Sequence, residues 1–206
     1  MSPTLFRAEP YIASDPAAIV RDYPFATLIL ADMSATTTAI VFETDDSQTT
    51  LIGHMAARNP QAKTMRTGDR ALAIFAGPHA YISPRWYVEK PEVPTWNYVA
   101  AHVRGTLEVI DDEAGQTDVL RRTIDIAENA FSAPWTIDMA PEGRVAFLLP
   151  KIRSFRVHVD SLEGTTKLSQ THPEGDRERI IAGLKERSDP TISDLMSAQW
   201  RRPPAG

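Results

Sequence analysis

The stretch AIFAGPHAYISPRWYVEKPEVPTWNYVAAHVRG, residues 73–105, carries apolar runs together with four of the chain's 16 prolines. Residues 70–77 and 79–83 predict two strands, because both runs are apolar and Gly77 and Pro78 separate them. Residues 96–111 predict one long strand with a possible bulge near Gly105. Antiparallel strands joined by a turn-rich segment are therefore expected at the centre of the chain.

Aromatic side chains crowd the turn-rich part of this stretch. Ser83 and Asn97 add hydrogen-bonding groups among the rings. Such a cluster more often packs in a core or an interface, but an apolar wall with a few polar groups also suits a flat heterocycle. Both interpretations stay open at this point. The rings are those of Trp86, Tyr87, Trp96 and Tyr98.

Elsewhere, strands dominate the middle of the chain and helices its ends. Strands are expected at 25–30, 34–43, 49–52 and 152–164. Helices are expected at 14–24, 53–65, 112–131, 141–150, 174–187 and 189–200. No Gly-rich turn follows the first strand, which argues against a dinucleotide-binding sheet. This order of strands and helices favours the α+β class, with a mainly β chain. The expected architecture is an antiparallel β-barrel with peripheral helices.

Composition excludes several classes of function. The chain has 206 residues, no cysteine and a formal net charge of -5. Disulfides, thiolate metal sites and cysteine nucleophiles are excluded, and a surface that is basic throughout, as in many nucleic-acid binders, is not expected. The five histidines lack metal-ligand spacing, so no metal site is predicted. Nothing resembles a signal peptide or a membrane span, so we expect a cytoplasmic protein without a membrane partner.

Two short segments are candidates for binding an anion. In GHMAARNP, residues 53–60, a helical turn would place His54 and Arg58 on one face, with Arg58 able to fork onto a phosphate. The alternative is a solvated arginine on a surface helix. In GTTKLSQTH, residues 164–172, Lys167 and Ser169 would share a face of an extended strand, with Gln170 beside them. A polar strand end explains that pattern equally well, and no catalytic residue is predicted.

The blocks GHMAARNPQ, IFAGPHAYISPRWY, VPTWNYVAAHVRG and KLSQ, the last followed by DRERIIAGL, closely resemble the PaiB-like family of FMN-binding negative transcriptional regulators. The resemblance covers nearly all of residues 5–187. It implies a split β-barrel of the flavin-reductase and pyridoxamine-phosphate-oxidase type, and a homodimer with FMN at the subunit interface. An FMN-binding domain over residues 1–188, including the late helices, and a C-terminal tail or helix over 189–206 are then expected.

The resemblance also implies roles for particular residues. His54 and Arg58 become the phosphate candidates. The cleft would be lined by Tyr81, Ser83, Trp96 and Asn97, and the late strand would contribute Lys167, Ser169 and Gln170, reaching toward the partner's flavin. One departure stands out. Where the family carries His-(Leu/Ile)-Pro on an early strand beside the flavin ring, this chain has threonines within SATTT, residues 34–38.

Several functions follow from the resemblance. The first is a transcriptional regulator or flavin-linked sensor, acting through DNA or a protein partner. No helix-turn-helix is visible, so Arg201 and Arg202 are the local basic candidates. The second is an FMN-dependent oxidoreductase that passes electrons from a nicotinamide cofactor to a small acceptor. The third is a barrel for haem or another flat ligand, with His54, His79 or His102 as an axial ligand.

Overall fold

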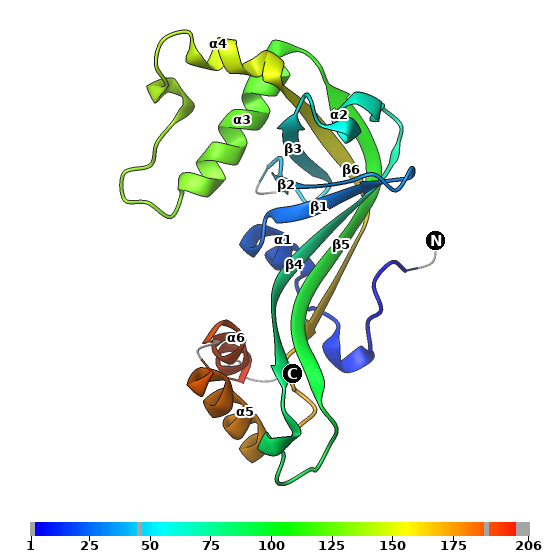
Figure 1. Cartoon of the computed structure of the whole chain (residues 1–206), viewed down its shortest axis with the longest axis vertical. Helices are drawn as coiled ribbons and strands as arrows, with labels where there is room; N and C mark the ends of the chain where they lie inside the picture. The colour runs from blue at the N-terminus through cyan, green and yellow to red at the C-terminus, as the bar shows by residue number, and fades with distance from the viewer. Residues whose placement is uncertain (1–2, 45–46, 188–189, 201–206) are drawn as a thin grey trace. The chain divides into compact units, whose positions relative to one another are not determined.

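Six strands close into a barrel in the order β1-β2-β3-β6-β5-β4 (Figure 1). The structure is a computed structural model that describes residues 3–44, 47–187 and 190–200. The strands are β1 (Phe25–Leu30), β2 (Ala35–Phe42), β3 (Thr50–Ala56), β4 (Arg70–Ile82), β5 (Thr95–Ile110) and β6 (Ile152–Lys167). The helices are α1 (Pro16–Asp22), α2 (Pro60–Thr64), α3 (Glu113–Glu128), α4 (Arg144–Leu148), α5 (Glu174–Glu186) and α6 (Pro190–Trp200). The predicted antiparallel barrel with peripheral helices is confirmed.

The chain divides into two compact units. Unit 1 holds the described residues of Met1–Pro16, Ala76–Ala101 and Glu163–Gly206, and unit 2 holds Ala17–Phe75 and His102–Leu162. Strands β4, β5 and β6 each contribute residues to both units. Arg201 and Arg202 lie outside the described residues. No described helix has the length and apolar character needed to cross a membrane.

The core of unit 2 follows from the alternation along its strands. In β1, the burial of FATLIL alternates strictly after Phe25, as a strand with one buried face requires. Leu28, Ile40, Leu51 and Phe155 are completely buried. Helix α3 packs through a separate apolar cluster of Val41, Ile52, Ile110, Val119 and Ile126. The amphipathic pattern of α3 therefore serves to cover the sheet.

The predicted break at Gly77 and Pro78 is wrong, because β4 runs without interruption from Arg70 to Ile82. Its alternation of buried and exposed residues is disturbed only at residues 76–79. Strand β1 pairs with β4 over Ala71–Ile74, so Pro78 lies beyond that ladder. On the side that faces β1, therefore, no strand requires an N–H donor from residue 78, which is a position where a proline is tolerated.

The predicted helix over residues 53–65 is wrong in its first half. Strand β3 continues to Ala56, and only Pro60–Thr64 form a helix. Gly53 is paired on both sides, with Ile40 of β2 and Phe155 of β6. A Cβ atom at Gly53 would lie 2.7 Å from the Phe155 ring and 2.9 Å from the Ala39 carbonyl oxygen. This glycine therefore allows close packing inside the sheet, and does not form the tight turn that was predicted.

Gly105 is required where β5 approaches β6. A Cβ atom at this position would lie 2.2 Å from the His158 carbonyl oxygen and 2.6 Å from the Val157 side chain. The alternation of burial along β5 continues through Gly105 without a shift. The glycine thus lets two backbones come together in an otherwise regular strand.

Unit 1 is organised around α5 and α6, which lie side by side (Figure 1). The Trp86 ring covers Gly183 of α5, where a Cβ atom would lie 2.3 Å from it. Tyr87 is buried and stacks on His172, with the ring centroids 4.6 Å apart and the planes inclined by 3°. These two aromatic residues of the opening stretch therefore serve packing within the unit.

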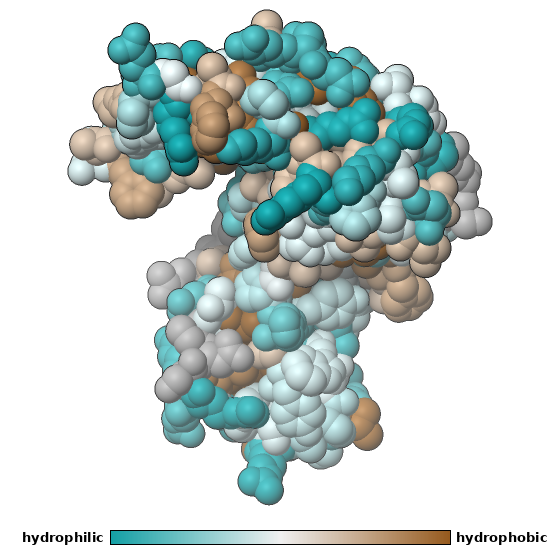
Figure 2. All heavy atoms as spheres, turned by 45° about the horizontal axis from the view of Figure 1, so that its top comes forward, coloured by the Kyte–Doolittle hydropathy of each residue, from teal (hydrophilic) through white to brown (hydrophobic). Residues whose placement is uncertain are grey.

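Unit 2 also exposes several apolar side chains near α3 and α4, where Figure 2 shows brown atoms among polar ones. Phe131, Met139 and Phe147 are 63%, 62% and 58% exposed. The Phe147 ring lies 3.5 Å from the Lys151 ammonium, a cation–π arrangement that partly covers it.

Candidate functional site

Side chains of β2 contact β3 and the turn that joins β3 to α2. The Thr38 hydroxyl donates a hydrogen bond to the His54 carbonyl oxygen at 2.6 Å. The Asn59 amide donates to the Thr36 hydroxyl oxygen at 3.0 Å, across 23 positions of sequence. The threonines that depart from the family pattern are thus bound to the segment that was predicted to hold a phosphate. We call Thr36, Thr38, His54, Arg58 and Asn59 the β2–β3 site.

His54 lies on β3, and not on a helix, so it does not share a helical face with Arg58. Its Nδ1 atom is buried and has no hydrogen-bond partner among the described residues. Burial lowers the pKa of His54 below the ordinary value, so the ring is neutral near pH 7. A buried polar atom without a partner is costly unless something absent from the chain satisfies it.

Arg58 lies in the turn between β3 and α2 and is exposed. No described carboxylate lies within salt-bridge distance of its guanidinium. The neighbouring Asn59 fixes the turn, because its Oδ1 accepts the Gln61 backbone N–H at 3.0 Å and begins α2. The turn therefore carries an exposed arginine without an ion-pair partner among the described residues, next in sequence to an amide that is bonded to a hydroxyl. Guanidinium, amide and hydroxyl groups are donors that fit a phosphate monoester.

In unit 1, β5 and the end of β6 bring together three of the other predicted residues. The Asn97 amide donates to the Ser169 hydroxyl oxygen at 3.0 Å, and Asn97 is completely buried. The Lys167 ammonium donates to the Thr95 hydroxyl at 2.5 Å. Sequence positions separated by 72 residues thus lie in contact.

The remaining predicted residues make local contacts. The Ser83 hydroxyl accepts the Arg85 backbone N–H at 3.3 Å and begins a short 3₁₀ helix, Pro84–Trp86. The Gln170 side chain accepts the Leu168 N–H and donates to the Thr166 carbonyl, so it closes a turn. Tyr81 and Trp96 are 37% and 54% exposed, and their rings meet edge to face at 5.8 Å.

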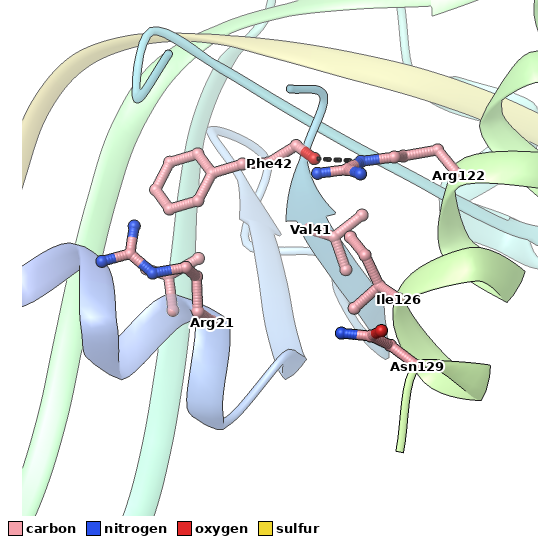
Figure 3. A pocket seen from close by; sticks show the side chains of 7 residues that line it. Arg21, Val41, Phe42, Arg122, Ile126 and Asn129 are labelled. Atoms are coloured by element: carbon pink, nitrogen blue, oxygen red, sulfur yellow. Dashed lines mark hydrogen bonds between the residues drawn. The ribbon is translucent and has the colours of Figure 1, made fainter. Parts of the chain in front are cut away.

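Sequence reasoning missed Asn59 and the cavity between α1, β2 and α3 (Figure 3). The signal for Asn59 was present, since Asn before Pro60 is a frequent start of a helix. The cavity, of about 240 Å³, has no local signal because three distant segments form it. Arg122 crosses it and donates from Nε to the Phe42 carbonyl oxygen at 3.2 Å. It is lined by Val20, Arg21, Val41, Phe42, Arg122, Ile126 and Asn129.

The closed six-stranded barrel is of the split-barrel class predicted from the sequence. A family model described as "Putative FMN-binding domain" matches residues 6–161, and the chain belongs to this family. The family and the FMN cofactor predicted from the sequence are confirmed.

Proteins similar in sequence include one from Bacillus subtilis, the "Protease synthase and sporulation protein PAI 2", at 29% identity over 85% of this chain and 86% of that protein. An uncharacterised protein of Emericella nidulans, AN0679, is 32% identical over 69% of this chain and 70% of that protein.

Two solved structures share the fold. The "FAD and Heme binding protein" from Mycobacterium smegmatis superimposes with a TM-score of 0.56 at 18% identity, over 81% of this chain and 76% of that one. The flavocytochrome Anf3 from Azotobacter vinelandii superimposes with a TM-score of 0.54 at 13% identity, over 84% of this chain and 78% of that one. At these identities the likeness concerns the fold alone.

Proposed function

We propose that the chain binds FMN at the β2–β3 site and works as a flavin-linked sensor with a regulatory output. The observation that carries the proposal is the exposed Arg58, which has no ion-pair partner among the described residues and precedes Asn59, whose amide is bonded to the Thr36 hydroxyl. In this arrangement Arg58 neutralises the phosphate, and Asn59 and Thr36 supply hydrogen bonds of fixed direction. Because Arg58 has no ion pair with a described carboxylate, no such pair has to be broken before the phosphate binds.

The flavin itself supplies the redox chemistry when it is bound, and the chain supplies orientation and electrostatics. The side chains of the β2–β3 site are hydroxyls, an amide, a guanidinium and an imidazole, with no carboxylate among them. His54 stays neutral and offers Nδ1 as a buried polar atom. The site is therefore built to hold a cofactor, and none of its groups is needed as a general acid or base.

Two observations support the regulatory part. Similarity to the Bacillus subtilis protein extends over 85% of the chain, and that protein's name refers to protease synthesis and sporulation. A net charge of -5 favours action through a protein partner over direct reading of DNA. We also propose a homodimer, because the exposed Tyr81 and Trp96 rings form an aromatic surface of the kind enriched in interfaces.

A second candidate is an FMN-dependent oxidoreductase that takes electrons from a nicotinamide cofactor. Its support is the fold shared with a protein that is named a flavocytochrome. The two candidates differ in turnover. A sensor holds its flavin without sustained catalysis, whereas an oxidoreductase oxidises the nicotinamide cofactor continuously in the presence of an acceptor.

The deciding experiment is a titration of the purified protein with FMN, followed by flavin absorption and fluorescence quenching. Saturable binding of FMN at low micromolar concentration is expected. A protein that leaves FMN fluorescence unchanged would contradict the proposal. With FMN bound, the rate of nicotinamide oxidation relative to free FMN then separates the two candidates, since only the oxidoreductase exceeds it.

A further inference from the structure

Unit 1 contains its own cavity, of about 330 Å³, at the end of β6. We call it the Lys167 cavity. The cavity is surrounded by three segments: the N-terminal segment, the turn between β4 and β5, and the end of β6. It is lined by Tyr11, Tyr87, Lys90, Glu92, Val93, Pro94, Thr95, Lys167, Ser169, Thr171 and His172. None of these residues belongs to the β2–β3 site.

Lys167 places a positive charge in this cavity. Its ammonium donates to the Thr95 hydroxyl and lies 5.7 Å from the centre of the Tyr11 ring. No described carboxylate lies within salt-bridge distance of it. A hydroxyl and an aromatic face position the ammonium but do not neutralise it, so the charge remains available to an anion.

Two polar atoms of the cavity wall are buried without partners among the described residues. They are the Tyr87 hydroxyl and His172 Nδ1, carried on the stacked pair of rings. Tyr87 is only 7% exposed. Burial, together with nearby Glu92 and Asp176, raises the pKa of Tyr87, so its hydroxyl stays protonated and can donate. Such orphaned groups are rare in folded proteins and indicate a missing partner.

The charges at the rim set the charge of the ligand. Lys90 is already paired with Glu92, at 3.2 Å, and the Lys90 backbone N–H is fixed by Asp176 at 2.9 Å. Burial and the neighbouring Lys90 lower the pKa of His172, which leaves the ring neutral near pH 7. With one lysine neutralised and the other free, the lining carries a single excess positive charge. A monoanion complements this single charge better than a dianion does.

Backbone strain lies in the same wall. Ser169 has φ of 58°, a left-handed conformation that residues other than glycine adopt at a cost. Its hydroxyl exchanges hydrogen bonds with the buried Asn97 amide, at 3.0 and 3.2 Å, and these hold the conformation. Strained residues held in this way concentrate at ligand sites.

We propose that the Lys167 cavity is a binding site for a small organic carboxylate, separate from the flavin site. The carboxylate lies against the Lys167 ammonium, and the Tyr87 hydroxyl donates to an oxygen of the same ligand. The proposal does not depend on the flavin-linked function, since every residue that carries it lies in unit 1. It assigns Lys167 and Ser169 to a second ligand, in place of the flavin role implied by resemblance.

The test is calorimetric titration of the full chain with benzoate and with acetate, in a buffer free of carboxylate and phosphate. Benzoate adds a flat ring that can rest on Tyr11 or Tyr87. Saturable binding of at least one carboxylate is expected. Lys167→Met should weaken it roughly tenfold to a hundredfold, the range of one charge-assisted hydrogen bond. Tyr87→Phe should weaken it too, while the free protein becomes no less stable, because an unpartnered hydroxyl is removed.

The control is Lys185→Met, which removes an exposed lysine of α5 and should leave carboxylate binding unchanged. All variants are also titrated with inorganic phosphate and with FMN, after circular dichroism has shown that they fold. Absence of carboxylate binding, binding of phosphate alone, or equal affinity in Lys167→Met would overturn the proposal. So would a loss of FMN affinity in Lys167→Met, because it would place this lysine at the flavin.

Discussion

The Asp176 carboxylate accepts the Val88 backbone N–H at 2.7 Å, which ties the first turn of α5 to the turn between β4 and β5. The same carboxylate accepts the N–H groups of Glu89 and Lys90, at 3.0 and 2.9 Å, and is paired with Arg179. One completely buried side chain thus satisfies three consecutive donors. These contacts fix the backbone that carries Lys90 to the rim of the Lys167 cavity.

Replacing Asp176 by Asn should lower the melting temperature by several degrees at pH 7. Burial alone would raise the pKa of Asp176, but the hydrogen bonds from Val88, Arg179, Glu89 and Lys90 outweigh it, and the pKa lies below the ordinary value. The stabilisation is therefore present above about pH 4, where the unfolded chain is ionised, and is lost as the pH falls through the folded pKa. Thermal unfolding at pH 7 and at pH 3 measures both effects. Glu178→Gln, on the exposed side of the same helix, is the matched control, and equal melting of both variants at pH 7 would refute the role of Asp176.

Replacing Arg58 by Ala should weaken FMN binding by about 1.5–3 kcal/mol, the range of a hydrogen bond to a charged group. Riboflavin, which lacks the phosphate, should bind the variant and the wild type equally. Fluorescence titration with both flavins measures the difference. Arg144→Ala, which removes an exposed arginine of α4, should change neither affinity. An equal loss for riboflavin would show that Arg58 does not contact the phosphate.

Replacing Gly105 by Ala should destabilise the barrel by about 1–3 kcal/mol, because the added methyl group collides with the His158 carbonyl of β6. Urea unfolding measures the loss. Ala35→Val, which enlarges an exposed position of β2, should stay within about 0.5 kcal/mol of the wild type. If the Gly105→Ala variant were as stable as the wild type, the backbones of β5 and β6 would not lie as close together as the structure shows.

Replacing His54 by Gln should flatten the dependence of stability on pH between about 7 and 5. The pKa of His54 lies below its ordinary value because the ring is buried, so the unfolded chain takes up a proton that the folded chain resists. Stability therefore falls as the pH drops below about 6.5, at no more than about 1.4 kcal/mol per pH unit for one proton. Urea unfolding across this range compares the two slopes, and identical slopes would exclude His54 as the titrating group.

The strands and helices whose local sequence pattern is distinctive could be predicted from the sequence. The alternation in residues 152–164 and the spacing of Val119, Ile124 and Ile126 gave β6 and α3 close to their observed bounds. The helix predicted at residues 53–56 is wrong because the sequence His54–Ala57 is compatible with a helix when it is considered alone. The seven positions at which β3 pairs with β6 make this segment a strand. The predicted break at Gly77 and Pro78 was wrong for a related reason, since the end of the ladder with β1 before Pro78 cannot be read from this segment alone.

The candidate site was predictable in its residues but not in its geometry. The helical face predicted for Arg58 does not form, and the hydrogen bond between Thr36 and Asn59 joins two segments that no spacing relates. The prediction that Lys167 and Ser169 share a face of an extended strand is wrong, because β6 ends at Lys167 and Ser169 has a left-handed backbone with φ of 58°. Their contact with Thr95 and Asn97, and the strained backbone at Ser169, depend on β5 and could not be read from their own segment.

Asn59 uses both ends of its amide, Oδ1 to begin α2 and Nδ2 to hold Thr36. The carboxamide carries its acceptor and its donor on two separate atoms, so aspartate, which only accepts when ionised, preserves the first contact and loses the second. A substitution at Asn59 therefore changes the contact with β2 and the start of α2 together. Some substitutions of Asn59 should therefore weaken flavin binding, and others should lower the stability of the protein.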